Sequence, residues 1–519
     1  MAYFSILDLG KPEAESASRP GFFWDLNLNQ IIDMIQLQSP QYNISKMYYR
    51  FPLDEACVEY RKKIYGDVKR TEVYECLRVF SEGMRRSAAA GSNREAAKTG
   101  LQRGAWHVDA VQEYCAAVSG LQGALSGIQL QSEGLRRLSE YLDDYTDQED
   151  FQKCRREAES IQRTMEDFHL ILEIEDNRIV VTQGKRNCSY AKKLGYGEDV
   201  KKLTPFLPGP GMSPLEEAIF DTFRRKNPEF FDRVEDFSER FPSYEDSTIL
   251  QLEQEIQYYL AFWRFEEKLK EQGFDFCAPD KGGSREMEAE GLYDLALACA
   301  NCTRGRSVVS NDFVYKKGEQ FFVVGGPNQG GKTTFARSLG QLVYFAGMGL
   351  DVPAARAYVP YFAALLTHFS AEESLGSGKG KLKEELTRLA PMMKEQAEGA
   401  FVIINELFTT AAHYDGCVMG KRVLTHFIEK GCMGIYVTHL KELGNSIEGV
   451  TALTAMLDGS RERKRTYKIS REKLGDVGYA EDIVNKYGLT YQELHRRLMG
   501  DKEGRNEGKA IISGQGMEG

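Results

Sequence analysis

The residues with the clearest chemical purpose form a glycine-rich stretch in the second half of the chain, Gly326-Pro327-Asn328-Gln329-Gly330-Gly331-Lys332-Thr333, followed by Thr334. It matches the pattern G-x-x-x-x-G-K-[ST], whose glycines let backbone N–H groups turn toward a phosphate. Lys332 would neutralise the β- and γ-phosphates of a nucleotide, and the Thr333 hydroxyl would bind Mg²⁺. An apolar run precedes the loop and a helical pattern follows it, so a helix dipole would add to the site. The stretch therefore predicts a nucleotide and Mg²⁺ site.

Two other apolar runs end in groups that could act on such a nucleotide. The run 400–404 is followed by Asn405 and Glu406, and the run 434–438 is followed by His439. In phosphate-loop proteins the carboxyl end of a buried strand commonly holds Mg²⁺ and polarises water. Glu406 is the candidate general base, although a solvated glutamate at an ordinary strand end would look the same. His439 could sense the γ-phosphate, although a lone histidine is more often structural.

The elements that must position these groups differ between the two halves of the chain. After about residue 285, short apolar runs alternate with helical segments, which is typical of a mostly parallel α/β sheet. These runs cover 307–309, 320–324, 363–369, 400–404 and 434–438. Residues 45 to about 275 are mostly helical in pattern, except at 170–182, where two apolar runs flank a Glu-Asp-Asn turn and predict a hairpin.

The longest helical pattern covers 244 to about 273, with apolar residues at spacings of three and four: Ile249, Leu252, Ile256, Tyr259 and Trp263. Such a helix would be roughly 45 Å long. It could be a core helix of a bundle or a lever that joins two domains. We therefore expect four parts: an N-terminal segment (1–44), a helical core and lever domain (45–284), an α/β domain (285–498) and a disordered, glycine-rich tail (499–519).

Composition and charge exclude several classes of protein. The chain has 519 residues, of which 42% are hydrophobic and 28% are charged, so wholesale disorder is excluded. A net charge of −10 argues against a surface that is basic throughout, although nucleic acid needs only a basic patch. The densest basic cluster is Arg461 to Arg465 with Lys468, between two β-like runs, where we favour a solvated hairpin over a DNA contact.

The cysteine content and the N-terminal residues indicate in which cellular compartment the protein would fold. Ten cysteines are too dilute for a disulfide scaffold. Cys299 and Cys302 form a C-x-x-C without a second pair at zinc-ligand spacing, so two thiols on an apolar face are favoured over zinc. The first residues do not resemble a signal peptide, and no run of 18 apolar residues is free of charge. We therefore expect a soluble, cytoplasmic protein with no membrane span.

These motifs together resemble the MutS family of DNA mismatch-repair ATPases. The loop 326–334 is similar to the family's Walker A loop, including Pro-Asn after the first glycine, and 309–312 resembles the segment whose asparagine contacts the adenine. Further matches are 404–407 with its Walker B, 413–416 with its dimer-facing loop, 438–443 with its switch histidine segment, and 478–480 through 487–489 with its closing helices. The resemblance is close over about 290–498. It reaches weakly back to the long helix, 52–54 and 60–61.

The resemblance implies an ABC-type P-loop ATPase domain preceded by a mostly helical core and lever domain. Its ligands would be ATP, held by the loop 326–334 and Asn311, and Mg²⁺, held by Thr333 and, through water, by Asn405. Lys332, Glu406 and His439 would be the catalytic residues. The whole would be a homodimeric, nucleotide-gated clamp on DNA in repair or recombination.

The sequence departs from the family at four places. Asn405 replaces an aspartate, residues 408–410 replace a Gly-Arg-Gly, and Gly380 stands where the signature loop 377–381 has its serine. These changes favour slow hydrolysis without opposing nucleotide binding, and Glu373 could supply a compensating acid. Only about 44 residues precede the core and they hold no Phe-x-Glu wedge, so we expect a truncated member without the mismatch-reading domain. The run Phe22 to Asp25 fits a hydrophobic anchor against the core.

Two interpretations from different classes remain open. The first is an ATPase that works as a dimeric clamp on branched or damaged DNA. The second is a nucleotide-dependent interaction module that binds ATP and dimerises but hydrolyses ATP slowly or not at all. An ABC-type transporter ATPase is a distant third, because the long helical region ahead of the loop and the histidine segment argue against it.

Overall fold

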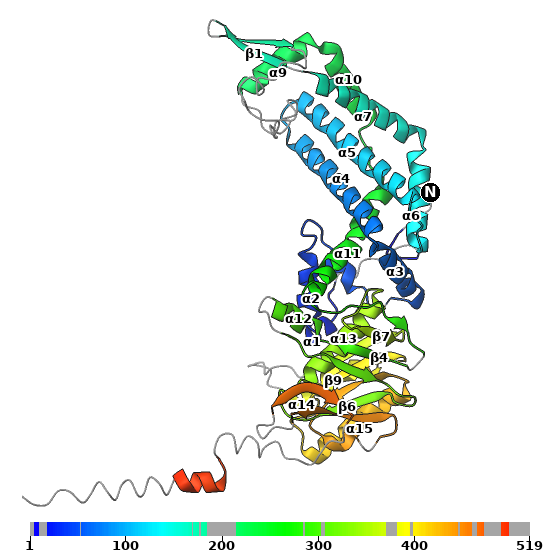
Figure 1. The fold of residues 1–519 in the computed structure, drawn as a ribbon, viewed down its shortest axis with the longest axis vertical. Helices are drawn as coiled ribbons and strands as arrows, with labels where there is room; N and C mark the ends of the chain where they lie inside the picture. The colour runs from blue at the N-terminus through cyan, green and yellow to red at the C-terminus, as the bar shows by residue number, and fades with distance from the viewer. Residues whose placement is uncertain are drawn as a thin grey trace, which may run out of the picture.

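The protein is elongated, with helices at one end and β-sheets at the other (Figure 1). The computed structural model describes residues 5–9, 18–51, 53–168, 170–175, 178–183, 214–283, 286–302, 307–369, 381–394, 398–444, 447–458, 464–471 and 489–497. Several sequence predictions fall outside these ranges, namely those for Glu373, the signature loop up to Gly380, the segment 478–488 and the tail. Among the described residues, no helix is both long and apolar enough to cross a membrane.

The helical end is built mostly of helices, as the sequence pattern of residues 45 to about 275 predicted. Its elements are α3 (Glu55–Val68), α4 (Thr71–Ala96), α5 (Gly100–Ser126), α6 (Glu133–Thr146), α7 (Glu149–Asp167), α9 (Pro214–Lys226) and α10 (Pro228–Arg240). Side chains at the N-caps define where helices begin: Asp54 accepts the Cys57 N–H at 2.8 Å, and Thr99 forms a capping box with Gln102 at the start of α5. The predicted hairpin is confirmed as β1 (Leu170–Glu175) antiparallel to β2 (Arg178–Gln183).

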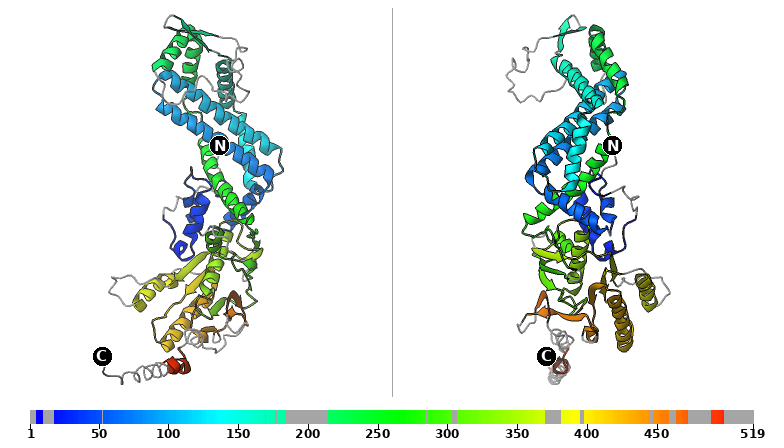
Figure 2. Two further views of the ribbon diagram at one scale, coloured as in Figure 1. Left: turned by 60° about the vertical axis from the view of Figure 1, so that its left-hand side comes forward. Right: turned by 90° about the vertical axis from the view of Figure 1, so that its right-hand side faces the viewer.

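Helix α11 (Ser247–Lys270) joins the two ends of the molecule (Figures 1 and 2). It has 24 residues, so it is about 36 Å long and shorter than the sequence predicted. It is buried on most sides, as a core helix would be. It also reaches the sheet end, where the Tyr258 hydroxyl donates to the Met348 carbonyl at 2.9 Å and the Phe262 ring lies 5.6 Å from that of Phe345. The helix is therefore a buried element that also contacts the sheet end.

The sheet end is a mixed α/β structure. Its main sheet has six strands in the order β12-β11-β6-β10-β9-β8, all parallel except β12. These strands are β6 (Phe321–Gly325), β8 (Ala364–Phe369), β9 (Ala400–Asn405), β10 (Met433–Val437), β11 (Val450–Leu457) and β12 (Arg465–Ser470). Residues of β6, β9 and β10 are all buried, which explains their unbroken apolar runs.

A second sheet of four strands has the order β3-β7-β4-β5. Its strands are β3 (Asp280–Lys281), β4 (Glu288–Leu292), β5 (Asn311–Val314) and β7 (Arg356–Val359). The expected strand at 307–309 was wrong, because these residues have no regular structure and β5 begins at Asn311. The remaining elements are α12 (Leu295–Cys302), α13 (Lys332–Gly347), α14 (Lys381–Lys394), α15 (His413–Glu429) and η2 (Lys441–Gly444).

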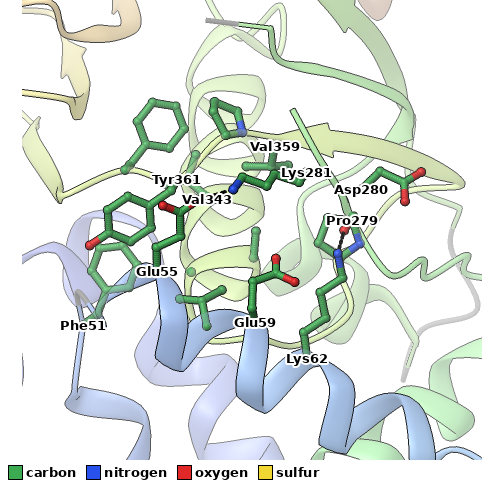
Figure 3. A pocket seen from close by; sticks show the side chains of 15 residues that line it. Phe51, Glu55, Glu59, Lys62, Pro279, Asp280, Lys281, Val343, Val359 and Tyr361 are labelled. Carbon is green, nitrogen blue, oxygen red and sulfur yellow. Dashed lines mark hydrogen bonds and ion pairs between the residues drawn. The ribbon is translucent and has the colours of Figure 1, made fainter. Parts of the chain in front are cut away.

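Helix α3 is fastened to the sheet end beside α13, as Figure 3 shows. Lys281 forms an ion pair with Glu55 at 2.6 Å, and the Lys62 ammonium donates to the Pro279 carbonyl. The approach is close: Gly349 has φ +73°, and a Cβ there would lie 2.6 Å from the Cβ of Arg61. Only glycine fits this junction without displacing α3.

The N-terminal segment packs against the sheet end. It contains α1 (Phe22–Asp25) and α2 (Leu28–Gln36), and η1 (Ser45–Tyr49) follows it. Phe23 is fully buried with its ring 5.5 Å from that of Tyr344 on α13, whereas Trp24 is exposed. The Asp25 carboxylate accepts from the Thr367 hydroxyl of β8 at 2.6 Å. The anchor expected at 22–25 is therefore present, and it contacts α13 and β8.

Candidate nucleotide site

The glycine-rich loop connects β6 to α13, so its backbone N–H groups precede a helix N-terminus. Gly326 has φ +120°, and a Cβ there would lie 3.0 Å from the backbone nitrogen of Ala455 on β11. Gly331 has φ +92° at the N-cap of α13. Both positions favour glycine because their φ angles are positive. At Gly326 there is also no space for a Cβ beside Ala455. The glycines of the motif are thus explained by the geometry of the turn.

Lys332 lies at the first turn of α13 and is only 4% exposed. Its ammonium donates to the Gly326 and Pro327 carbonyls, each at 3.0 Å. Burial lowers the pKa of Lys332, and the nearby Glu406 carboxylate opposes that shift. An ammonium has three N–H donors, so one remains beyond these two bonds. A buried cation of this kind is stabilised by an anionic ligand.

Thr333, the residue after Lys332, is hydrogen-bonded to the Asn405 side chain. The Thr333 hydroxyl donates to the Asn405 side-chain oxygen at 3.0 Å. Asn405 is the last residue of β9 and is 9% exposed. The pair joins α13 to the end of β9, which β10 separates from β6, and the sequence predicted Mg²⁺ there. An amide oxygen and a hydroxyl are acceptable ligands or water partners for Mg²⁺, but they bring no charge.

Glu406 and His439 lie together at the ends of β9 and β10. The His439 Nε2 is 3.3 Å from the Glu406 Oε1, and both side chains are partly exposed. The strands are parallel neighbours, so their carboxyl ends meet at one edge of the sheet. Glu406 has φ +54°, a strained value for a residue with a Cβ, and its N–H donates to the Val437 carbonyl at 2.9 Å. Such strain is typical of functional positions.

Phe408 also has a glycine-like backbone, with φ +64°. It is buried, and its N–H donates to the Glu385 carboxylate at 3.1 Å. This residue stands where the sequence comparison with the family placed a glycine. The turn is therefore kept with a phenylalanine, at a backbone cost on the order of 1–2 kcal/mol.

A cavity of about 990 Å³ brings most of these groups together. This volume is at the upper end for small-molecule sites. One wall is polar and contains Asn328 to Thr334 with Glu406 and His439, and another is largely apolar: Leu292, Tyr293, Leu297, Val308 and Val309. Gly326, Pro327 and Asn405 do not line the cavity. They lie behind its polar wall: the Gly326 and Pro327 carbonyls accept from Lys332, and the Asn405 side chain accepts from Thr333.

The hairpin β11–β12 supplies cavity residues that sequence reasoning missed. Arg465 lines the cavity and donates to the Gln329 side chain at 2.9 Å, and Lys468 donates to the Ser310 carbonyl. The hairpin itself is confirmed, but these two basic residues are not simply solvated, because Arg465 contacts the glycine-rich loop and Lys468 contacts the segment before β5. Tyr467 lines the same cavity with φ +59°. The dense basic cluster was the signal that could have revealed Arg465.

Asn311 lines the cavity, but its amide is engaged by β12. Its Nδ2 donates to the Tyr467 carbonyl at 3.2 Å, and its Oδ1 accepts the Ile469 N–H at 2.8 Å. In this arrangement Asn311 fixes the hairpin against the apolar wall. Cys299 and Cys302 lie on α12 as free thiols. In the described part of the chain, neither belongs to a group of three metal-ligating side chains.

Comparison with known proteins gives an independent reading of the same region. Residues 322–488 match the family described as MutS domain V. The chain is 29% identical over 138 residues to the DNA mismatch repair protein MutS of Thermotoga sp. (strain RQ2), covering 27% of this chain and 17% of that protein.

Two further relatives show the same pattern. Endonuclease MutS2 of Thermus thermophilus is 27% identical over 246 residues, covering 42% of this chain and 32% of that protein. The DNA mismatch repair protein MSH2 of Saccharomyces cerevisiae is 30% identical over 139 residues, covering 26% and 14%. Each match thus spans less than a third of the relative's length. The loop, the strand ends and these similarities lead to one conclusion: residues 322–488 belong to the family described as MutS domain V.

Proposed function

We propose that the cavity binds ATP with Mg²⁺ and that the protein hydrolyses ATP to ADP and phosphate on a P-loop, ABC-type ATPase fold. One observation carries the proposal: Lys332, Thr333 and the Glu406–His439 pair line a single cavity, and Asn405 is bonded to Thr333 behind its wall. No single group would distinguish a nucleotide site from an ordinary polar cleft. Their arrangement around a helix N-terminus supports phosphoryl chemistry.

The cavity suits a nucleotide in volume and polarity. Buried Lys332 and the exposed Arg465 place positive charge around the loop where phosphates would lie. The apolar wall with Tyr293 and Val309, and the Tyr467 ring, offers a surface for a base. We propose that Asn311 supports this wall by holding β12, and that any contact it makes with adenine would require its amide to rearrange.

The chemical roles follow from the two strand ends. Glu406 would accept a proton from the attacking water, because its carboxylate is partly exposed at the cavity. His439 at 3.3 Å would hold that carboxylate and contact the γ-phosphate. Thr333 and Asn405 would hold the metal, Asn405 through a water molecule. Mg²⁺ would neutralise the charge on the β- and γ-phosphate oxygens.

The helical region could couple the nucleotide site to a ligand bound far from it. We propose that 45–284 is a core and lever domain, 285–498 the ATPase domain, and the whole a homodimeric, nucleotide-gated DNA clamp in repair or recombination. The hydrogen bond from Tyr258 of α11 to Met348 and the close approach of α3 to Gly349 support this coupling, because both residues follow α13, which begins at the glycine-rich loop. Two of the relatives above are named DNA mismatch repair proteins, which supports DNA as the ligand.

A second candidate function is a nucleotide-dependent interaction module with little turnover. The Asn405 side chain favours it, because the oxygen beside Thr333 belongs to an amide and not to a carboxylate. In this case ATP would still bind and promote dimerisation. Hydrolysis would be slow because the metal and the water near Glu406 would be held less firmly.

Steady-state ATP hydrolysis with and without DNA separates the two candidates. Wild type should hydrolyse ATP, DNA should change the rate, and Glu406→Gln should abolish turnover while retaining ATP binding. Binding to branched and linear duplexes at two salt concentrations should show the strong salt dependence of phosphate-backbone recognition. ATP binding and dimerisation with no turnover above that of Glu406→Gln would instead support the interaction module. Absence of ATP binding would refute both.

A further inference from the structure

Three side chains with metal-binding atoms lie together outside the nucleotide cavity. They are His413, Cys417 and Glu442. The His413 Nε2 is 3.0 Å from the Glu442 Oε1 and 3.9 Å from the Cys417 Sγ. The Cys417 Sγ is 3.6 Å from the Glu442 Oε2. All three ligand atoms therefore fit within the reach of one ion.

The fold explains how the group forms. His413 and Cys417 are four residues apart at the start of α15, so they lie on the same face of the helix. Glu442 comes from η2, which follows β10. None of the three lines the nucleotide cavity. The proposed ATPase chemistry does not use them, and their contacts are a histidine–carboxylate pair with a thiol beside it.

The distances approach those of a tetrahedral site, with the ligand atoms all within 4.8 Å of one another. Zinc binds histidine nitrogen and carboxylate oxygen at about 2.0–2.2 Å and cysteine sulfur at about 2.3 Å. In a tetrahedron, such bonds place the ligand atoms roughly 3.3–3.6 Å apart, by geometry from those bond lengths. The His413 nitrogen lies 3.9 Å from the Cys417 sulfur. One carboxylate oxygen of Glu442 lies 3.0 Å from that nitrogen, and the other lies 3.6 Å from the sulfur, so the carboxylate must turn for one oxygen to serve as the ligand. Small side-chain rotations would therefore complete the site.

We propose that His413, Cys417 and Glu442 form a binding site for a divalent transition-metal ion of the Zn²⁺ class. Thiolate and imidazole ligands select such an ion over Mg²⁺ or Ca²⁺, which prefer oxygen. His413 and Glu442 are more than half exposed, which leaves the fourth position to water. On binding, the Cys417 thiol loses its proton to solvent and the sulfur takes up the metal.

The metal would join two loops that matter for the nucleotide site. His413 and Cys417 lie at the end of the loop that begins with Glu406, and Glu442 lies three residues after His439. A bound ion would therefore link the segment 406–417 to the segment 438–444. It would restrict the motion of Glu406 and His439 without touching either. The metal site itself does not depend on the proposed ATPase function.

The test uses Co²⁺ as a spectroscopic probe on the full-length, chelator-treated protein. Coordination by a thiolate gives a charge-transfer band in the near ultraviolet. Wild type should develop this band with one equivalent of Co²⁺, and Zn²⁺ should remove it by competition. Cys417→Ser should lose the band, and its affinity for the metal should fall by at least about a hundredfold. Even losing a residue that only orients a ligand costs roughly 10–100-fold.

The matched control is Cys76→Ser, which removes another partly exposed thiol, on α4 and far along the chain from the group. It should keep the wild-type band and affinity, and Glu442→Gln should weaken both. Circular dichroism and thermal unfolding establish that each variant is folded. A wild-type band and affinity in Cys417→Ser, or no band in wild type, would overturn the site.

Amide hydrogen exchange tests the link between the two loops separately. Zn²⁺ should slow exchange in 406–417 and 438–444 of wild type and leave Cys417→Ser unchanged. Metal binding without slower exchange in either segment would overturn the link. Since this readout needs no ATP, its failure is distinguishable from a failure of the proposed function.

Discussion

Replacing Asn405 by aspartate restores a carboxylate beside Thr333 without changing the size of the side chain. Asn405 is 9% exposed and its oxygen lies 3.0 Å from the Thr333 hydroxyl. A carboxylate and Mg²⁺ about 4 Å apart at an effective dielectric constant of about 20 attract by roughly 8 kcal/mol, twice the value for two unit charges. Burial of the new carboxylate and repulsion from adjacent Glu406 offset most of that gain. We expect a net gain of about 1.4 kcal/mol in Mg²⁺ binding, which corresponds to a tenfold change.

The assay is a Mg²⁺ titration of the ATPase rate for wild type and Asn405→Asp. The curve of the variant should shift about tenfold toward lower Mg²⁺. Without nucleotide and metal the variant should unfold at a lower temperature, because the buried charge then has no cation. Asn405→Ala is the control, since it removes the acceptor of the Thr333 hydroxyl and should raise the Mg²⁺ requirement. Overlapping curves for wild type and Asn405→Asp would refute the reasoning that the missing carboxylate limits the metal.

Three further predictions test separate parts of the account. Glu406→Gln should form an ATP-dependent dimer in light scattering, and a monomer with and without ATP would count against the clamp. Arg465→Gln should weaken ATP binding about three- to tenfold in calorimetry and AMP binding less, because the Arg465 guanidinium lies beside the glycine-rich loop. Equal losses for ATP and AMP would show that Arg465 does not contact the β- or γ-phosphate. Burial lowers the pKa of His107 to about 4, so its folded form stays neutral while the unfolded form takes up a proton below pH 6.5. Between pH 7 and pH 5 the free energy of unfolding should therefore fall by about 2 kcal/mol more in wild type than in His107→Gln, as followed by urea titration.

The parts of the fold that the sequence predicted well are those with local causes. The glycine-rich loop, the strand before it and the helix after it are consecutive in sequence, so the residues 321–347 are enough to predict all three. The strand ends with Glu406 and His439 could be placed side by side because parallel strands share an edge. The mixed α/β end and the helical part before it are confirmed as coarse architecture.

The parts that were missed depend on contacts between distant residues. The run 307–309 is as apolar as a strand, but it forms a wall of the cavity instead of pairing. The direction of Arg465 depends on how β12 pairs with β11, which composition does not reveal. Glu442 lies 25 residues after Cys417 in sequence, so only the fold brings its carboxylate to the helix that carries His413 and Cys417.

The central claim is that the cavity beside Lys332 binds ATP, and calorimetry of Mg²⁺·ATP binding tests it most directly. Wild type should bind one ATP per chain. Lys332→Ala should bind at least about tenfold more weakly, since a charge-assisted contact contributes ~1.5–3 kcal/mol. Lys317→Ala, which removes an exposed lysine just before β6, should bind as wild type does. Equal affinity in wild type and Lys332→Ala, or no binding by wild type, would contradict the account.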